Sequence, residues 1–171
     1  MSHFTTCTPS QLSQADFVAV FADIYEHSPW VAEVVYQQGI DANADNISAL
    51  HERMSAVLLN ASQDKQLALI NAHPDLAGRA AMNGELTQAS TSEQAGAGID
   101  QCTAEEFSRF TQLNDAYKAK FQFPFIKAVR GANRHLILAD FERRIHNDVD
   151  TEFQQALLEI NKIAGFRLND L

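Results

Sequence analysis

Apolar residues recur along this chain at intervals of three and four positions, the spacing that gathers them on one face of an α-helix. Only seven Gly and four Pro interrupt the pattern, and no run alternates apolar and polar residues as a half-buried strand does. The sequence therefore predicts an all-α protein without a sheet. Because the expected helices differ in length and surround a loose middle segment, we expect an irregular multi-helix packing rather than a regular bundle.

Local signals set the ends of the expected helices. Pro74 disfavours helical backbone at the residue before it, so one helix should end at His73. The segments predicted to be helical are 14–26, a short one between Ser28 and Gly39, one from Asn46, one from Ser62 to His73, one from Thr103 to Pro124, 134–146 and 149–168. The segment 73–102, which contains Asn83-Gly84, is expected to be irregular. No linker or repeat divides the chain, so residues 1–171 are predicted to form a single helical domain.

The cysteines and the apolar content indicate the class of protein. A chain of 171 residues that is 46% hydrophobic can bury a core without disulfides or a structural metal. Cys7 and Cys102 lie far apart and form no C-x-x-C pair, which favours free thiols in a reducing compartment. No signal peptide and no apolar run of ~18 residues is present. We therefore expect a cytoplasmic protein without a membrane segment.

The charge balance excludes some partners. Thirteen Lys and Arg against 22 Asp and Glu give a formal net charge of −9, which repels phosphate backbones and anionic lipid. We therefore expect neither nucleic acid nor a membrane surface as a partner. A protein of this charge that binds an anionic small molecule needs a few positive groups or backbone N–H donors at the site, so each Arg is a candidate.

The six histidines show no metal-binding pattern, because no pair has H-x-x-x-H or H-E-x-x-H spacing. The sequence therefore predicts no metal site. His51 and His146 lie in charged helical stretches and are expected to be solvated. His73 differs because it leaves a helix at a turn that Pro74 fixes. Two interpretations stay open for it: a helix-end residue that satisfies a terminal carbonyl, or an acid/base group.

Three further patterns have both a structural and a functional interpretation. Ser90 and Glu93 have the spacing of a capping box, which would make the pair purely structural. The aromatic run 121–126 is typical of core, although the break at Pro124 frees backbone groups that a ligand could use. Arg167, near the chain end, is by default solvated or compensates a helix dipole. The glycines at 96 and 98 lack a preceding strand and a Gly-Lys-Ser/Thr, so nucleotide binding is excluded.

Four motifs follow one another along the chain: His73-Pro74-Asp75-Leu76-Ala77-Gly78, then Leu86-Thr87 with Ser90, Glu93-Gln94 and Ala97-Gly98, then Phe121 and Phe123-Pro124-Phe125-Ile126 with Arg130-Gly131, and Ile163-Ala164 with Arg167-Leu168. In this order they resemble the OHCU decarboxylases, enzymes of purine degradation that act on 2-oxo-4-hydroxy-4-carboxy-5-ureidoimidazoline. The resemblance covers nearly the whole chain. Ile99 stands where the family usually has Leu, and the chain lacks a peroxisomal tail, as expected of a bacterial-type cytoplasmic member.

The resemblance implies an all-helical fold, a homodimer, a small-molecule substrate and no metal or organic cofactor. It also implies conversion of the substrate to (S)-allantoin in urate degradation. The site residues that it implies are His73 and Glu93 as catalytic groups, with Pro74, Ser90, Gln94, Phe125, Ile126 and Arg167 binding substrate. In this scheme His73 acts as acid/base, and the other groups orient the substrate.

Two alternatives stay open at this point. One is a lyase or hydrolase that acts on another ureide. The other is a non-enzymatic helical interaction module whose loose middle segment binds a partner. Such a module would not need a His, a Glu and an Arg from three separate segments, so a ligand pocket rather than a flat apolar patch would separate the two classes.

Overall fold

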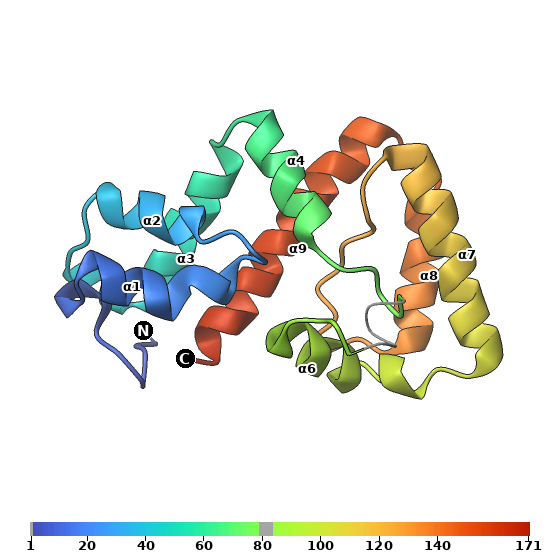
Figure 1. Ribbon diagram of the computed structural model, residues 1–171, viewed down its shortest axis with the longest axis horizontal. Coiled ribbons are helices and arrows are strands. Elements are labelled where there is room, and N and C mark those ends of the chain that lie inside the picture. The colour runs from blue at the N-terminus through green and yellow to red at the C-terminus, as the bar shows by residue number, and fades with distance from the viewer. Residues whose placement is uncertain (1, 79–83) are drawn as a thin grey trace. The chain divides into compact units, whose positions relative to one another are not determined.

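The computed structural model describes residues 2–78 and 84–171, and Figure 1 shows the order of their helices. The α-helices are α1 (Gln14–Phe21), α2 (Trp30–Gln37), α3 (Ile47–Leu59), α4 (Gln63–Ala72), α6 (Gln88–Gly96), α7 (Ala104–Phe121), α8 (Arg134–Arg144) and α9 (Val149–Asn169). The short 3-10 helices are η1 (Pro9–Gln11), η2 (Ala22–Ile24), η3 (Ala42–Asp45) and η4 (Ile99–Gln101). Within the described residues, β structure amounts to one isolated bridge between His3 and Asn46. The predicted all-α class is confirmed.

The chain divides into two compact units. Unit 1 comprises Met1–Ala72 and Ile160–Leu171, and unit 2 comprises His73–Glu159. Helix α9 therefore supplies its first turns to unit 2 and its last turns to unit 1. The single domain expected over residues 1–171 stays a prediction.

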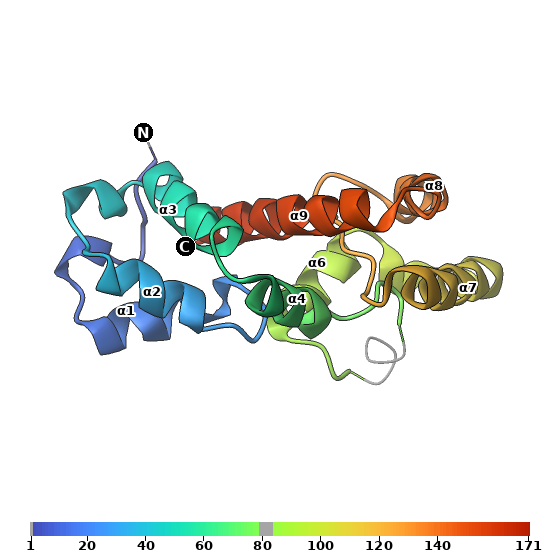
Figure 2. The same ribbon diagram turned by 90° about the horizontal axis from the view of Figure 1, so that it is seen from above.

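In unit 1, helix α2 packs against both α1 and α3 (Figure 2). Several helix boundaries there match the local signals. Asn46 Oδ1 accepts the amide of Ala49 at the start of α3, and α4 ends at Ala72, before Pro74. Gly39 follows α2 with φ of 100°, a conformation that glycine adopts without a steric penalty.

The predicted end of the first helix at residue 26 and the predicted cap of the second helix, Ser28, are both wrong. The helix was expected to reach residue 26, but α1 ends at Phe21, and the backbone becomes extended at Tyr25 after η2. Tertiary contacts explain the early end, because the buried Tyr25 hydroxyl donates to Asn161 Oδ1 and Glu26 pairs with Arg167. Ser28 does not cap α2, since its hydroxyl donates to the Glu26 carbonyl.

His51 is not solvated, contrary to the sequence-based expectation. Its ring is partly buried in unit 1, and Nε2 lies 2.6 Å from the carbonyl oxygen of Asn161 on α9. A Cβ at Gly165 would lie 3.0 Å from the ring, so the absence of a side chain there makes room for the histidine. His146, in contrast, is exposed as predicted.

In unit 2, α7 and α8 lie side by side (Figures 1 and 2). Helix α7 begins after Thr103, as predicted, and the structure shows a capping box there, in which the side chains of Thr103 and Glu106 each accept the other residue's backbone amide. It ends at Phe121, where Gln122 takes a left-handed conformation two residues before Pro124. The aromatic residues that α7 buries include Phe110, Tyr117 and Phe121.

The segment 73–102 is more regular than predicted, because it contains α6 and η4. Asn83, which contributed to that prediction, lies outside the described residues. The capping box expected at Ser90 and Glu93 is also wrong. The N-cap residue is Thr87, whose hydroxyl accepts the Ser90 amide at 3.2 Å, and so Ser90 and Glu93 lie within the helix.

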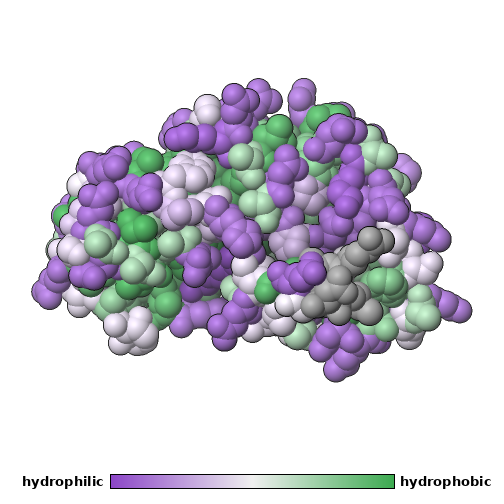
Figure 3. All heavy atoms as spheres, in the orientation of Figure 1, coloured by the Kyte–Doolittle hydropathy of each residue, from purple (hydrophilic) through white to green (hydrophobic). Residues whose placement is uncertain are grey.

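Polar and apolar side chains intermix on the face drawn in Figure 3. Among the described residues, the exposed large apolar side chains are Leu59, Leu67, Leu136, Val149 and Leu158. They are spread over α3, α4, α8 and α9, and isolated apolar residues of this kind are ordinary on protein surfaces. None of the helices described has the length and apolar content needed to cross a membrane.

Candidate active site

The first motif, residues 73–78, forms a tight turn directly after the end of α4, and this turn belongs to unit 2. Ala77 has φ of 51°, a left-handed conformation that costs free energy for a residue with a Cβ. A Cβ at Gly78 would lie 2.6 Å from the Asp75 Cβ, so no other residue fits there without a shift of the backbone. The turn is therefore a specific backbone shape that the surrounding structure must maintain.

Three side chains from two helices hold this turn. From α6, Gln94 Oε1 accepts the amide of Ala77 at 3.1 Å. From α7, Asn114 Nδ2 donates to the Leu76 carbonyl at 2.9 Å, and Lys118 Nζ donates to Asp75 Oδ2 at 2.6 Å. Asn114 and Lys118 are four residues apart and so project from the same side of α7. These contacts fix the backbone immediately after His73.

The same turn meets the face of α6 that carries the second motif. Ser90, Glu93 and Gln94 stand at i, i+3 and i+4, which places them on one side of the helix. Ser90 and Gln94 are buried, and Glu93 and His73 are partly exposed. The bond from Gln94 to the Ala77 amide shows that this side faces the turn. Unit 2 thus contains both the turn after His73 and the face of α6 that carries Ser90 and Glu93, and the hydrogen bond from Ala77 to Gln94 links the two.

The third motif lies after α7 in an extended segment of unit 2. Phe125 stacks on Phe141 with ring centroids 3.8 Å apart, and the Ile126 carbonyl accepts a hydrogen bond from Arg144 Nη1 at 2.8 Å. Both residues are buried, as the interpretation of the aromatic run as core predicts.

Tyr117 on α7 donates a hydrogen bond from its hydroxyl to the buried carboxylate of Glu152. Burial and the neighbouring Glu152 carboxylate raise the pKa of Tyr117, so its hydroxyl stays protonated.

Arg167, the fourth predicted element of the site, belongs to unit 1. It lies in the last turn of α9 and is only 7% exposed, so the solvated interpretation is wrong. Nη1 lies 2.9 Å from the buried carboxylate of Glu26 and donates to the Asp23 carbonyl at 3.1 Å. Its planar fork therefore joins α9 to the segment that follows α1.

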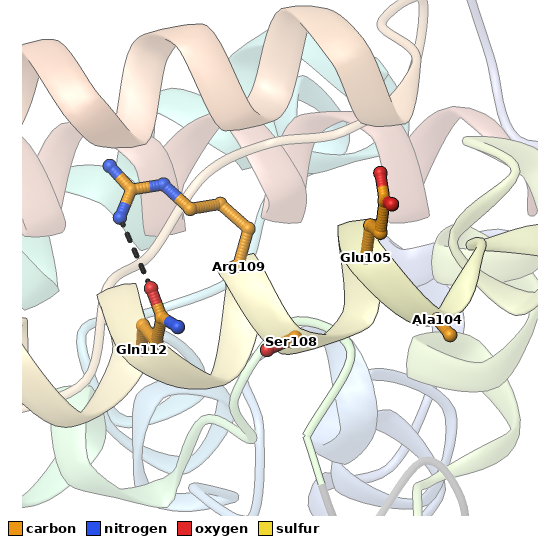
Figure 4. A pocket seen from close by; sticks show the side chains of 5 residues that line it. All are labelled: Ala104, Glu105, Ser108, Arg109 and Gln112. Carbon is orange, nitrogen blue, oxygen red and sulfur yellow. Dashed lines mark hydrogen bonds between the residues drawn. The ribbon is translucent and has the colours of Figure 1, made fainter.

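None of the candidate site residues named above lines the shallow hollow on the surface of α7 that Figure 4 shows. The described residues that line it come from that helix alone, and its arginine, Arg109, is paired with Glu142. A hollow lined by one helix does not enclose a small molecule, so it is not the candidate site. Within the described residues, no three His, Cys, Asp or Glu side chains gather as metal ligands would.

Sequence reasoning missed the residues that support the site. Asn114 interrupts the apolar stripe of α7, and Glu152 and Arg144 are buried in α9 and α8. A polar residue on a helix face that is otherwise apolar was the available signal. Buried polar groups of this kind require partners, although the sequence does not say which ones.

Comparisons with known proteins agree with the fold and the motifs. Residues 10–169 match the family model described as OHCU decarboxylase. The 2-oxo-4-hydroxy-4-carboxy-5-ureidoimidazoline decarboxylase of Haloferax volcanii is 39% identical over 168 residues, which cover 98% of this chain and 96% of that protein. The enzyme of the same name from Halalkalicoccus jeotgali is 41% identical over 170 residues, or 98% and 93% of the two chains. A crystal structure of (S)-allantoin synthase superposes with a TM-score of 0.76 at 32% identity, covering 95% of this chain and 51% of that one.

Proposed function

The chain belongs to the OHCU decarboxylase family, and from this membership we propose that it converts 2-oxo-4-hydroxy-4-carboxy-5-ureidoimidazoline (OHCU) to (S)-allantoin in urate degradation. The observation that carries the proposal is the turn after His73, which Gln94, Asn114 and Lys118 hold against the face of α6 that bears Ser90 and Glu93. A fixed turn of this kind supports catalysis because orientation of reacting groups lowers the barrier.

The substrate itself supplies the electron sink for the reaction. Its carboxylate is attached to a ring carbon that bears a hydroxyl and lies next to a C=N bond. When the bond to the carboxylate breaks and CO2 leaves, its electron pair forms a C=C bond to the neighbouring ring carbon, and the π electrons of the C=N bond move to the nitrogen, which takes a proton. The hydroxyl of the resulting enol then loses its proton and becomes a ring carbonyl, while the former C=N carbon, which carries the ureido group, takes a proton on one face. The protein has to hold the carboxylate out of the ring plane, stabilise the developing charge and transfer protons.

His73 is the acid/base group in this proposal, acting at the hydroxyl-bearing carbon. An imidazole suits proton transfer near neutral pH, and such transfers contribute ~10²–10⁴-fold in rate. Glu93 is the second catalytic group, and its carboxylate accepts hydrogen bonds from the ring or ureido N–H groups of the substrate. The position of both on elements that Gln94 links together supports this assignment.

The remaining groups bind the substrate. Ser90 adds a hydrogen bond, Pro74 packs beside His73, and the backbone at Phe125 and Ile126 contacts the ligand. Gln94 already accepts from the Ala77 amide and donates to the Asp75 carbonyl at 3.5 Å, so its side chain retains a second oxygen lone pair and one N–H hydrogen for the substrate. Arg167 is a charge-assisted clamp on a ring carbonyl or the developing anion. The homodimer and the cytoplasmic location belong to the same proposal.

Freshly generated OHCU tests the function directly. Spontaneous decay of OHCU yields racemic allantoin, whereas an enzyme protonates one face. We expect the circular dichroism signal of (S)-allantoin to appear in proportion to protein concentration, and no signal in a reaction without protein. Allantoin that stays racemic while protein is varied would refute the proposed function.

A further inference from the structure

A buried ion pair in unit 2 has no role in the mechanism described above. Arg144 is 1% exposed and Glu152 is 0% exposed. Arg144 Nε donates to Glu152 Oε1 at 3.0 Å, and Nη2 lies 2.9 Å from the same oxygen. Tyr117 donates to Oε1 at 2.6 Å and Asn147 to Oε2 at 3.0 Å. Charges buried to this degree lose their hydration, and apolar residues of similar size commonly stabilise a fold as well or better. Stability alone therefore does not explain the pair.

The other end of Arg144 contacts two residues of the third motif, Phe125 and Ile126. Nη1 donates to the Ile126 carbonyl at 2.8 Å. The guanidinium carbon lies 4.3 Å from the centroid of the Phe125 ring, which also stacks on Phe141 at 3.8 Å and meets the Tyr117 ring edge-on at 5.4 Å. One side chain thus fixes a backbone carbonyl and the adjacent ring, a combination that depends on the planar shape of a guanidinium.

The segment that Arg144 contacts has no regular secondary structure to hold it, because residues 124–129 belong to no helix or strand. A second buried charge contacts the same segment two residues after Ile126, where Glu159 Oε2 accepts a hydrogen bond from the amide of Ala128 at 2.8 Å. Carbonyl and amide of a trans peptide point in opposite directions. With the Ile126 carbonyl turned toward Arg144, the amide of Lys127 in the same peptide unit is directed away from it.

We propose that Arg144 is a positioning residue for the decarboxylation: it sets the backbone at Phe125 and Ile126 in the orientation that the substrate requires, and Glu152 is the counter-ion that fixes Arg144. This inference rests on the proposed function, because only there is the backbone at Phe125 and Ile126 expected to contact the ligand. The buried pair is retained for the geometry of that segment rather than for the stability of the fold.

The test replaces the pair by apolar residues of similar size. In Arg144→Met combined with Glu152→Leu, we expect a thermal midpoint equal to that of the wild type or higher. We expect kcat to fall at least ~10-fold, with a smaller change in KM. The reason is that a displaced segment at Phe125 and Ile126 would weaken contacts to the transition state more than contacts to the bound substrate. The matched control is Arg109→Met combined with Glu142→Leu, which removes an exposed pair of the same residue types and should leave both constants unchanged.

Tyr117→Phe keeps the inference testable if the double variant does not fold. It removes only the hydroxyl that donates to Glu152, and the loss of one hydrogen bond to a charged group should lower kcat ~2–10-fold. Kinetic constants equal to those of the control, in either variant, would overturn the role of Arg144. Racemic allantoin from the wild type would instead refute the proposed function, so the two failures are distinguishable.

Discussion

At the scale of single residues, buried polar side chains position the turn after His73 in unit 2. Gln94 and Asn114 each occupy a place on a helix where an apolar residue would pack more simply, and each bonds to the backbone of the turn after His73. Such bonds are costly to lose, because the backbone group left behind is buried and unsatisfied. The turn after His73 therefore depends on buried side chains that two other helices supply.

His73→Ala tests the assignment of the acid/base group. His73 starts the turn but is only partly buried, so its loss should change stability little. We expect turnover to fall by ~10² or more, the contribution of a general acid/base. Steady-state kinetics checks this, with His146→Ala as the control because His146 is exposed on the surface. Near-normal turnover in His73→Ala would remove it from the catalytic groups.

Arg167 contributes to stability and, in our proposal, to substrate binding. Arg167→Gln should cost ~3–5 kcal/mol in the free energy of unfolding, because it removes the ion partner of the buried Glu26 carboxylate. The combination of Arg167→Gln with Glu26→Gln removes both charges and should recover most of that stability. If Arg167 clamps the substrate, kcat/KM stays low in the double variant. Recovery of kcat/KM together with stability would show that Arg167 is structural only.

At the scale of the elements, the start of α6 decides how the second motif is used. With Thr87 as the N-cap, Ser90 lies one turn inside the helix, on the side that faces the turn after His73. A cap at Ser90 would have committed its hydroxyl to backbone amides and left it unsuited to bind a ligand. The register of the helix thus makes Thr87 the capping residue and places Ser90 within the helix.

Alanine substitutions at the two positions should separate these roles. Thr87→Ala should lower the free energy of unfolding by about 1 kcal/mol through loss of the cap. Ser90→Ala should lower kcat/KM with a smaller effect on stability. Ser92→Ala, an exposed position on the same helix, is the control. Chemical denaturation and steady-state kinetics check all three variants, and the assignment of the cap is wrong if Ser90→Ala proves the more destabilising.

At the scale of the whole molecule, the reaction should need no metal. The histidines lack the spacing of metal ligands, and OHCU provides its own electron sink. Dialysis against a chelator should leave turnover unchanged. Activity that falls on dialysis and returns with added zinc would contradict this expectation.

The homodimer is a second property of the whole molecule. Light scattering on the purified protein should give twice the mass of one chain across a range of concentrations. The net charge of −9 keeps copies apart at long range, so a specific apolar interface would have to hold the dimer together, and its mass should change little with added salt. A mass of one chain at all concentrations would disprove the homodimer.

The sequence by itself determined those features that neighbouring residues control. Helical spacing predicted the all-α class, and the helix starts at Asn46 and Thr103 and the break at Pro74 were correct because each depends on contacts within about one turn of the chain. The motifs also indicated the family. Only the tertiary structure decided that α1 ends at Phe21, that Thr87 rather than Ser90 caps α6, and that Arg144 and Arg167 are buried in ion pairs. These outcomes depend on partners distant in sequence, and the free energy of burying a charge or an amide is fixed only when the fold brings those partners together.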